Sequence, residues 1–348
     1  MAIIKSAKEL VNNAVKQLLK YQSGEDTPVK TRYKHLNDNL LGGIFKNMMI
    51  IIAGISGSGK TYVLQQIEQD FLDKKLNPDA DDYILLRCNW EMTVFRLLLR
   101  RLSKGLKKTM KYILFNKPDK ENLIKFKEIT DQERSSNIFY LEEPTTPDVW
   151  YENVKAFLEQ HKKRKHILIT VDHIALVRDT GNKKKAMDEL VEYANSLKKE
   201  YKNVSFILIS QLNRDIENRV DPRFTPPKRS DLYNSDTMFH IGDLVLVIHN
   251  PFRLGIHKYM VVRPKDYPYL QDYMYSTDTK TTNFITENVI FWHYLKIREI
   301  DDMEDLKNLY IENIMDDEKY KEYMLRKKQQ EQSIGNDPDY EFTDDTPF

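Results

Sequence analysis

The residues with the clearest chemical meaning form a short loop early in the chain. The segment from Gly54 to Thr61 reads GISGSGKT and fits the pattern G-x-x-x-x-G-K-[ST]. It lies between the apolar run MMIIIA and the helical pattern TYVLQQIEQDFL, as a phosphate-binding loop requires. We expect Lys60 to contact the β and γ oxygens of ATP and Thr61 to bind Mg²⁺. The predicted nucleotide-binding residues of the loop are Gly54, Ser56, Gly57, Ser58, Gly59, Lys60 and Thr61.

Two carboxylates and one amide follow other apolar runs. Asp172 ends HILITVD, where a metal-bound triphosphate needs a carboxylate, so we predict that it binds Mg²⁺ directly or through water. Glu91 follows YILLRC and could activate the attacking water. Gln211 follows SFILIS, and its amide could donate to the γ-phosphate. On these residues alone, a solvated Glu91 and an ordinary polar Gln211 remain alternatives.

The elements that position these residues are short strands alternating with helices. Nearly continuous Ile, Leu and Val in the early runs indicate strands that are covered on both faces. The sequence therefore predicts an α/β protein with a doubly wound, mostly parallel sheet. The expected strands are Met49–Ala53, Tyr83–Cys88, Asn137–Leu141, His166–Val171, Ser205–Ile209, Leu244–Ile248, Tyr259–Arg263 and Val289–Trp292.

The two ends of the chain have different patterns. Residues Lys8 to Tyr21 carry an apolar stripe at helical spacing, and residues 22–28 form a polar linker. The stripe should dock on the body of the chain or on a neighbouring subunit, and both remain open. We expect one ATPase domain over residues 29–300, a charged helical extension over 301–328 and a disordered acidic tail over 329–348.

Composition limits the class of protein. The chain has 348 residues with 54 Lys plus Arg against 53 Asp plus Glu, so nucleic-acid binding would need a local basic patch. Cys88 is the single cysteine, which excludes an internal disulfide and a cysteine-cluster zinc site. No signal peptide or uninterrupted apolar span of about 18 residues is present. We therefore expect a soluble cytoplasmic protein without membrane contact.

Four segments together resemble the ATPase domain of DnaB-type hexameric replicative helicases, a family with the RecA fold. They are the phosphate-binding loop, residues Asn89 to Met92 with FRLLLRRLS after them, the strand ending at Asp172, and FILISQLNR. Farther on, RSDLYNS and YLKIRE resemble the loop after the sensor and the Lys-x-Arg pair of that family. The likeness covers roughly residues 29 to 298 by the order of these motifs.

The resemblance implies a ring of six subunits with ATP at each interface. Lys60, Thr61 and Asp172 would hold Mg-ATP, Glu91 would activate water, and Gln211 would sense the γ-phosphate. Arg298, with Lys296, would reach into the neighbour's site as an arginine finger. An exposed charged strand end is the alternative for this pair.

Single-stranded DNA would lie in the central channel of such a ring. Two basic loops are candidates for contacting it, although charge runs can also be merely solvated. Their predicted DNA-binding residues are Lys183, Lys184, Lys185, Arg223, Lys228 and Arg229.

The chain also departs from the family pattern. Trp90 replaces the usual leucine, residues 173–176 replace Tyr-Leu-Gln-Leu, and Tyr233 and Asn234 replace Arg and Glu. By this resemblance we expect the chain to lack the family's large N-terminal domain and to keep only the helix of residues 8–21, which matches the linker helix that packs on the adjacent subunit. DDMEDLKNLY replaces the glycine-containing hairpin after the Lys-x-Arg pair, which weakens the finger assignment most.

The C-terminal sequence DYEFTDDTPF resembles the acidic, Phe-ended tips of single-stranded-DNA-binding proteins. It predicts recruitment of a primase, polymerase or loader, with a solubilising tail as the alternative. The expected function is ATP-driven DNA unwinding at the replication fork, 5′ to 3′ by resemblance. A RecA-like recombinase and a nucleotide-switched scaffold or loader are the competing interpretations.

Overall fold

The structure is a computed structural model that describes residues 6–135, 137–179, 181–219, 221, 225–233, 236–298 and 308–314. The chain divides into two compact units. The first comprises Met1–Ile216, Pro227–Ile248 and His293–Asn308. The second comprises Glu217–Pro226, His249–Trp292 and Leu309–Phe348, so part of the expected single ATPase domain over 29–300 belongs to a separate unit.

A mostly parallel sheet forms the centre of the first unit. Its strand order is β9-β6-β1-β5-β4-β2-β3, and β1 pairs in parallel with both β5 and β6. Strands β4 and β5, β4 and β2, and β2 and β3 are also parallel pairs. The strands are β1 (Met49–Ala53), β2 (Tyr83–Asn89), β3 (Ile138–Leu141), β4 (His166–Asp172), β5 (Val204–Ile209), β6 (Leu244–His249) and β9 (Val289–Ile297).

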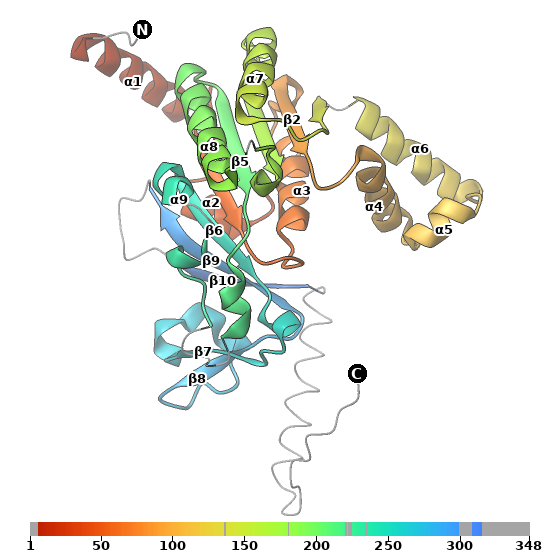
Figure 1. Cartoon of the computed structure of the whole chain (residues 1–348), viewed down its shortest axis with the longest axis vertical. Coiled ribbons are helices and arrows are strands. Elements are labelled where there is room, and N and C mark those ends of the chain that lie inside the picture. The colour runs from red at the N-terminus through yellow and green to blue at the C-terminus, as the bar shows by residue number, and fades with distance from the viewer. Residues whose placement is uncertain are drawn as a thin grey trace, which may run out of the picture. The chain divides into compact units, whose positions relative to one another are not determined.

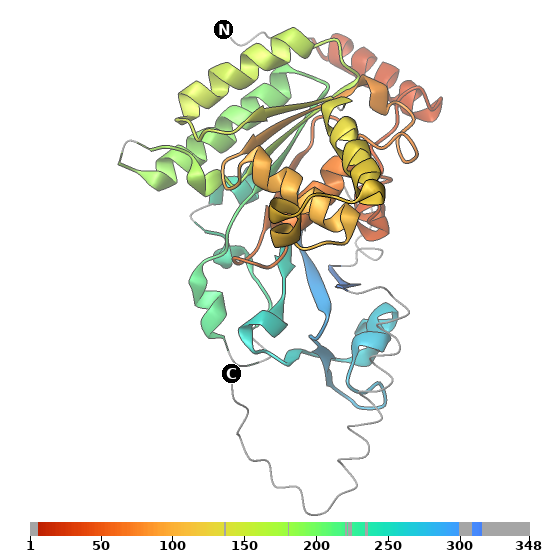
Figure 2. The same ribbon diagram turned by 90° about the vertical axis from the view of Figure 1, so that its right-hand side faces the viewer.

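Helices cover both faces of this sheet. Every residue of β1, β2, β4, β5 and β6 is buried, which explains their near-continuous apolar composition. Helices α7 and α8 pack side by side on one face, and α3 lies on the other (Figures 1 and 2). The helices are α2 (Lys34–Asn39), α3 (Lys60–Phe71), α7 (Pro147–His161), α8 (Lys183–Glu200) and α9 (Asp236–Ile241). This arrangement confirms the doubly wound α/β prediction.

A helical arm is inserted between β2 and β3. It consists of α4 (Val94–Leu106), α5 (Met110–Phe115) and α6 (Lys120–Ser135), and it projects from the edge of the sheet in Figure 1. Thr93 and Thr109 cap α4 and α5 by accepting hydrogen bonds from backbone amides. An ion pair between Arg101 of α4 and Glu133 of α6 holds the arm together.

The N-terminal helix α1 (Ala7–Gln22) agrees with the expected helix over residues 8–21. Ser6 caps it by accepting from the amide of Glu9. None of its residues is buried, and Leu10, Val11, Val15, Leu18 and Leu19 are each about half exposed or more. The apolar stripe therefore does not dock on the described part of its own chain.

The second unit is small and rich in aromatic residues. It contains β7 (Lys258–Val262) antiparallel to β8 (Thr282–Ile285), and β10 (Leu309–Asn313) lies beside the first part of β9. Tyr259, Phe284 and Phe291 are fully buried and form the centre of its core. Short 3₁₀ helices connect the elements of the two units: η1 (Ala80–Asp82), η2 (Ile174–Leu176), η3 (Arg214–Asn218), η4 (Arg229–Asp231), η5 (Pro251–Leu254), η6 (Pro264–Asp266) and η7 (Pro268–Tyr273).

The C-terminal prediction is partly wrong. A helical extension was expected over residues 301–328, but Leu309–Asn313 form strand β10. Leu309 and Ile311 alternate with more exposed residues, which suits a strand with one buried face. The rest of the expected extension and the whole acidic tail lie outside the described residues. Among the described helices, none is both long and apolar enough to cross a membrane.

Candidate functional site

The loop from Gly54 to Gly59 joins β1 to α3. A Cβ atom on Gly54 would lie 2.4 Å from the Ile248 carbonyl oxygen and 2.5 Å from Ser58 Oγ, so only glycine fits there. Gly57 and Gly59 have φ values of 75° and 104°, and Gly59 is the N-cap of α3. The glycines thus let the backbone curl tightly over the start of the helix, where amides and the helix dipole favour an anion.

Lys60 folds back over this loop. Its Nζ donates to the carbonyl oxygens of Gly54 and Ile55 at 2.8 and 2.7 Å. Burial lowers the pKa of Lys60 to about 8, although the nearby carboxylates of Asp172 and Glu91 oppose this shift. A buried cation held by two carbonyl oxygens is well suited to exchange them for the oxygens of a phosphate.

Asp172 lies at the end of β4, beside the first turn of α3. Only 3% of the residue is exposed, and its Oδ1 has no hydrogen-bond partner in the described part of the chain. Burial raises the pKa of Asp172 to about 6, a hydrogen bond with Thr61 opposes the rise, and the charge of Glu91 adds to it.

An unpartnered carboxylate oxygen in a buried site is costly, and a hard divalent cation would satisfy it. Thr61 supplies a hydroxyl to the same place. The described residues contain no group of three or more His, Cys, Asp or Glu side chains that could hold a metal by themselves. The site therefore fits a Mg²⁺ ion that takes its remaining ligands from a triphosphate and water.

Glu91 reaches the same edge of the sheet from β2. Asn89 pairs with Asp172 in the sheet register, and the amides of Trp90 and Glu91 donate to the Asp172 carbonyl at 3.0 and 3.2 Å. The Glu91 residue is exposed, whereas Asp172 is buried. These neighbouring carboxylates thus occupy different environments, one in contact with solvent and one not.

Gln211 joins the site from β5. The Ser210 amide donates to the Ile52 carbonyl at 2.9 Å, which holds this strand end beside β1. Gln211 Nε2 lies 3.3 Å from His173 Nε2, and the Tyr233 amide donates to the Gln211 carbonyl at 3.0 Å. Gln211 is therefore connected to the residue after Asp172 and to the segment around η4.

Lys296 and Arg298 lie at the opposite edge of the sheet. Arg298 Nη1 contacts Asp243 Oδ1 at 2.7 Å, and Asp243 Oδ2 accepts from the amide of Met49, the first residue of β1. The phosphate-binding loop follows the other end of this five-residue strand. At about 3.3 Å per residue, the two ends are roughly 13 Å apart, so the pair is remote from the loop of its own chain.

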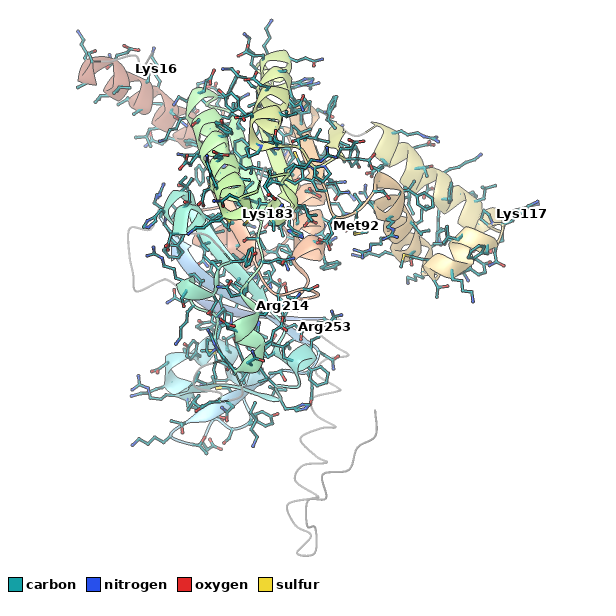
Figure 3. All side chains as sticks on the ribbon, viewed as in Figure 1. Lys16, Met92, Lys117, Lys183, Arg214 and Arg253 are labelled. Carbon is teal, nitrogen blue, oxygen red and sulfur yellow. The ribbon has the colours of Figure 1, made fainter. Side chains whose placement is uncertain are left out.

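The predicted DNA-binding residues come from two segments of the chain. Lys183 donates to the Val177 carbonyl and pairs with Asp179 at 3.3 Å near the first turn of α8 (Figure 3). Lys185 pairs with Glu189 at 3.6 Å, and Lys184 is exposed beside it. Lys228 precedes η4, Arg229 contacts α9, and Arg223 lies outside the described residues.

Sequence reasoning missed two groups near the site. His173 follows Asp172 directly, and its contact with Gln211 depends on two strands meeting. Glu68 of α3 pairs with Arg87 at 2.8 Å and accepts from Thr170 Oγ1 at 2.7 Å. His173, Glu68 and Arg87 are all buried. The sequence signal that could have identified Glu68 and Arg87 is the unusual presence of charged residues among apolar ones.

Comparisons with known proteins agree with the geometry. The model of the family described as DnaB-like helicase C terminal domain matches residues 28–261. A probable replicative DNA helicase of Trieres chinensis is 25% identical over 218 residues, which are 61% of this chain and 45% of that protein. Replicative DNA helicase DnaB of Pasteurella multocida (strain Pm70) is 39% identical over 84 residues, 24% of this chain and 17% of that protein. The chain thus spans less than half the length of these relatives.

Solved structures support the fold. A chain solved as an ATPase domain aligns with a TM-score of 0.61 and 14% identity, covering 85% of this chain and 93% of that one. A DnaB-like replicative helicase, from a structure that describes its interactions with primase, aligns with a TM-score of 0.57 and 15% identity, covering 85% and 63%. At these identities the likeness establishes the RecA-like fold.

Proposed function

Because the chain belongs to the family of DnaB-like helicase C-terminal domains, we propose that it is the ATP-driven motor of a replicative DNA helicase. One observation carries this proposal: the charges of Asp172 and Glu91 act on Lys60, and Gln211, which follows the strand beside β1, contacts His173, the residue after Asp172. They would serve as a metal ligand, a base and a γ-phosphate contact, which are groups that hydrolysis of a bound triphosphate needs.

The proposed roles follow from the environment of each side chain. The amides of the loop and Lys60 bind the phosphates, and Thr61 and Asp172 would hold Mg²⁺, which would neutralise part of the negative charge of the triphosphate. Exposed Glu91 accepts a proton from the attacking water, because its carboxylate is close to the site and remains in contact with solvent. Gln211 donates its amide to the γ-phosphate and leaves its contact with His173 to do so.

The proposed assembly is a homohexameric ring. Lys296 and Arg298 are remote from the loop of their own chain, so they could reach a triphosphate only in an adjacent copy. The unburied apolar stripe of α1 supplies a surface for contact between subunits. We propose that Lys183, Lys184, Lys185, Arg223 and Lys228 face single-stranded DNA in the channel, with 5′ to 3′ movement by resemblance.

Two further parts of the proposal concern partners and compartment. The acidic tail would recruit a primase, polymerase or loader, although its residues lie outside the described part of the chain. The cytoplasm is the proposed compartment, which suits the free, buried thiol of Cys88.

The test combines hydrolysis, unwinding and imaging. We expect the protein to hydrolyse ATP faster with single-stranded DNA, to unwind a forked duplex, and to form closed rings with a nonhydrolysable ATP analogue and DNA. Lys60→Ala should abolish hydrolysis and unwinding, whereas Lys199→Ala, which changes an exposed lysine of α8, should leave both unchanged.

Other outcomes would contradict the proposal in different ways. Open filaments would favour a recombinase. Slow hydrolysis that DNA does not stimulate, without unwinding, would favour a nucleotide-switched scaffold or loader.

A further inference from the structure

Three cations converge on two residues at the end of α9. Lys296 Nζ donates to the carbonyl oxygens of Phe239 and His240 at 2.6 and 2.9 Å. Arg298 Nη2 donates to the His240 carbonyl at 2.7 Å. Arg229 Nη2 lies 3.0 Å from His240 Nε2, so Arg229, which the sequence predicted to bind DNA, contacts the same residue as the Lys-x-Arg pair.

The Phe239 ring contacts two of these three cations. The Arg229 guanidinium carbon lies 4.5 Å from the ring centroid, and Lys296 Nζ lies 5.5 Å from it. Both distances are within the range of a cation–π contact. An aromatic ring that contacts two cations places them near each other without neutralising either of them.

Nearby carboxylates do not balance the positive charge. Asp243 already accepts from Lys198 at 2.6 Å as well as from Arg298. Asp236 is 81% exposed and contacts Arg229 at 3.2 Å, so solvent screens that pair. Four cations therefore face two carboxylates, and burial together with the charges of Arg298, Arg229 and Lys198 lowers the pKa of Lys296.

The cluster is held by folded elements and is partly open to solvent. Lys296 and Arg298 come from the end of β9, and the Arg229 and Arg298 side chains are 46% and 47% exposed. The segment of η4 is fixed as well, because the Asn213 amide donates to the Asp231 carbonyl at 2.7 Å. An excess of positive charge in a fixed position is suited to bind phosphate oxygens.

We propose that Arg229 is a third cation of the cluster with Lys296 and Arg298, and that the cluster binds the triphosphate held by an adjacent copy of this chain. The inference rests on the proposed function. A DNA backbone also offers phosphate oxygens, but Arg229 contacts the same two residues as the pair that cannot reach its own loop. The neighbour's nucleotide is therefore the ligand we assign.

The first experiment measures steady-state ATP hydrolysis of Arg229→Ala and Arg229→Lys. We expect Arg229→Ala to lower kcat about 100-fold, as loss of one transition-state donor does, with KM for ATP changed only a few-fold. Arg229→Lys should recover part of the loss because it keeps the charge. Arg263→Ala is the matched control, since Arg263 is an exposed arginine paired with Asp266 at 2.7 Å.

A merely structural role for Arg229 would give a different result. Such a role would lower the thermal midpoint of Arg229→Ala, and Arg229→Lys would not restore kcat. Either an unchanged kcat in Arg229→Ala or a loss explained by unfolding would overturn the inference.

The second experiment tests whether Arg229 acts on a neighbour. Lys60→Ala and Arg229→Ala subunits with different affinity tags are coexpressed, and oligomers that carry both tags are isolated. In such an oligomer an Arg229→Ala subunit has an intact phosphate-binding loop. A Lys60→Ala neighbour has an intact basic cluster, which can contact the triphosphate in that loop. We expect these mixed oligomers to hydrolyse ATP at least tenfold faster than either variant alone, and equal rates would overturn the inference.

A measurement of DNA binding distinguishes the neighbour's nucleotide from the DNA backbone as the ligand of Arg229. We expect the affinity of Arg229→Ala for single-stranded DNA, measured with a nonhydrolysable ATP analogue, to stay within about threefold of the unmodified protein. Weakened DNA binding with normal hydrolysis in the absence of DNA would assign Arg229 to the DNA backbone. Failure of the unmodified protein to hydrolyse ATP or to form oligomers would instead defeat the proposed function, and this inference with it.

Discussion

Individual side chains at the carboxyl edge of the sheet differ mainly in their exposure to water. Asp172 is buried and lacks a partner for Oδ1 among the described residues, so it gains most from a cation. Glu91 follows the end of β2 by two residues and is exposed to solvent. Two carboxylates at one site can therefore take separate roles, as a metal ligand and as a base.

This difference predicts the behaviour of Glu91→Gln. The amide keeps the size of the side chain but cannot accept a proton, so ATP hydrolysis should fall by a factor of about 10² to 10⁴. Affinity for a fluorescent ATP analogue with Mg²⁺ should stay within a few-fold, because Lys60, Thr61 and Asp172 remain. Glu128→Gln, on an exposed part of α6, is the control. Normal turnover by Glu91→Gln would remove Glu91 as the base.

Helices and strands hold these side chains through buried polar contacts as well as apolar packing. Glu68 links α3 to β2 and β4 through Arg87 and Thr170, and Arg87 continues to Tyr140 of β3 at 3.0 Å. At the amino edge, His166 Nε2 lies 2.9 Å from Ser205 Oγ, which donates to the Phe45 carbonyl. The single hydroxyl hydrogen is thus used, so His166 donates through Nε2.

His166 gives the fold a defined response to acid. Burial lowers its pKa from 6.5 to about 3, so the folded protein keeps it neutral while the unfolded chain takes up a proton below pH 6.5. Its contribution to stability is therefore complete above pH 6.5 and is lost as the pH falls from 6.5 towards 3. At about 1.4 kcal/mol per pH unit, the loss reaches about 2 kcal/mol at pH 5.

The matching measurement is urea unfolding of the unmodified protein and of His166→Gln at pH 7 and pH 5. The glutamine variant cannot take up this proton, so its free energy of unfolding should fall by about 2 kcal/mol less between the two pH values. His257→Gln, which changes a histidine with a 62% exposed side chain, should follow the unmodified protein. Equal pH dependence in all three proteins would contradict the assignment.

The first unit has the proposed nucleotide site at one edge of its sheet and the basic cluster at the other. A single chain cannot bring these together across β1, but copies arranged in a ring can. Helix α1 buries none of its residues in the described chain, its apolar stripe is exposed, and Lys16 also extends from it (Figure 3). Contact with another copy would bury this apolar stripe.

This arrangement predicts that Leu18→Lys disrupts assembly without disrupting folding. Leu18 is 55% exposed, so the thermal midpoint of the separate subunit should not change, whereas a charge in a subunit contact should cost several kcal/mol. Mass photometry with a nonhydrolysable ATP analogue should show smaller particles. Asn13→Lys adds the same charge to the polar side of α1 and should leave the rings intact. Rings formed equally by both variants would exclude α1 as a subunit contact.

Sequence alone predicted the local features. The phosphate-binding loop, the strands that carry Asp172, Glu91 and Gln211, and α1 depend on residue types within a few positions of one another. The family resemblance was also correct, because the motif order spans most of the chain. Strands β8 and β10 were missed because they lie in short segments whose strand pattern is weak, and β10 was taken for a helix.

Only the tertiary structure decided which distant residues meet. Glu68 and Arg87 are adjacent because α3 packs against β2, and Arg229 lies beside Lys296 and Arg298 because α9 and the end of β9 converge. Such pairings depend on the path of the chain between the residues and leave no periodic pattern in the sequence. Local geometry follows from neighbouring residues, but the position of a charge relative to a remote one follows from packing of the whole unit.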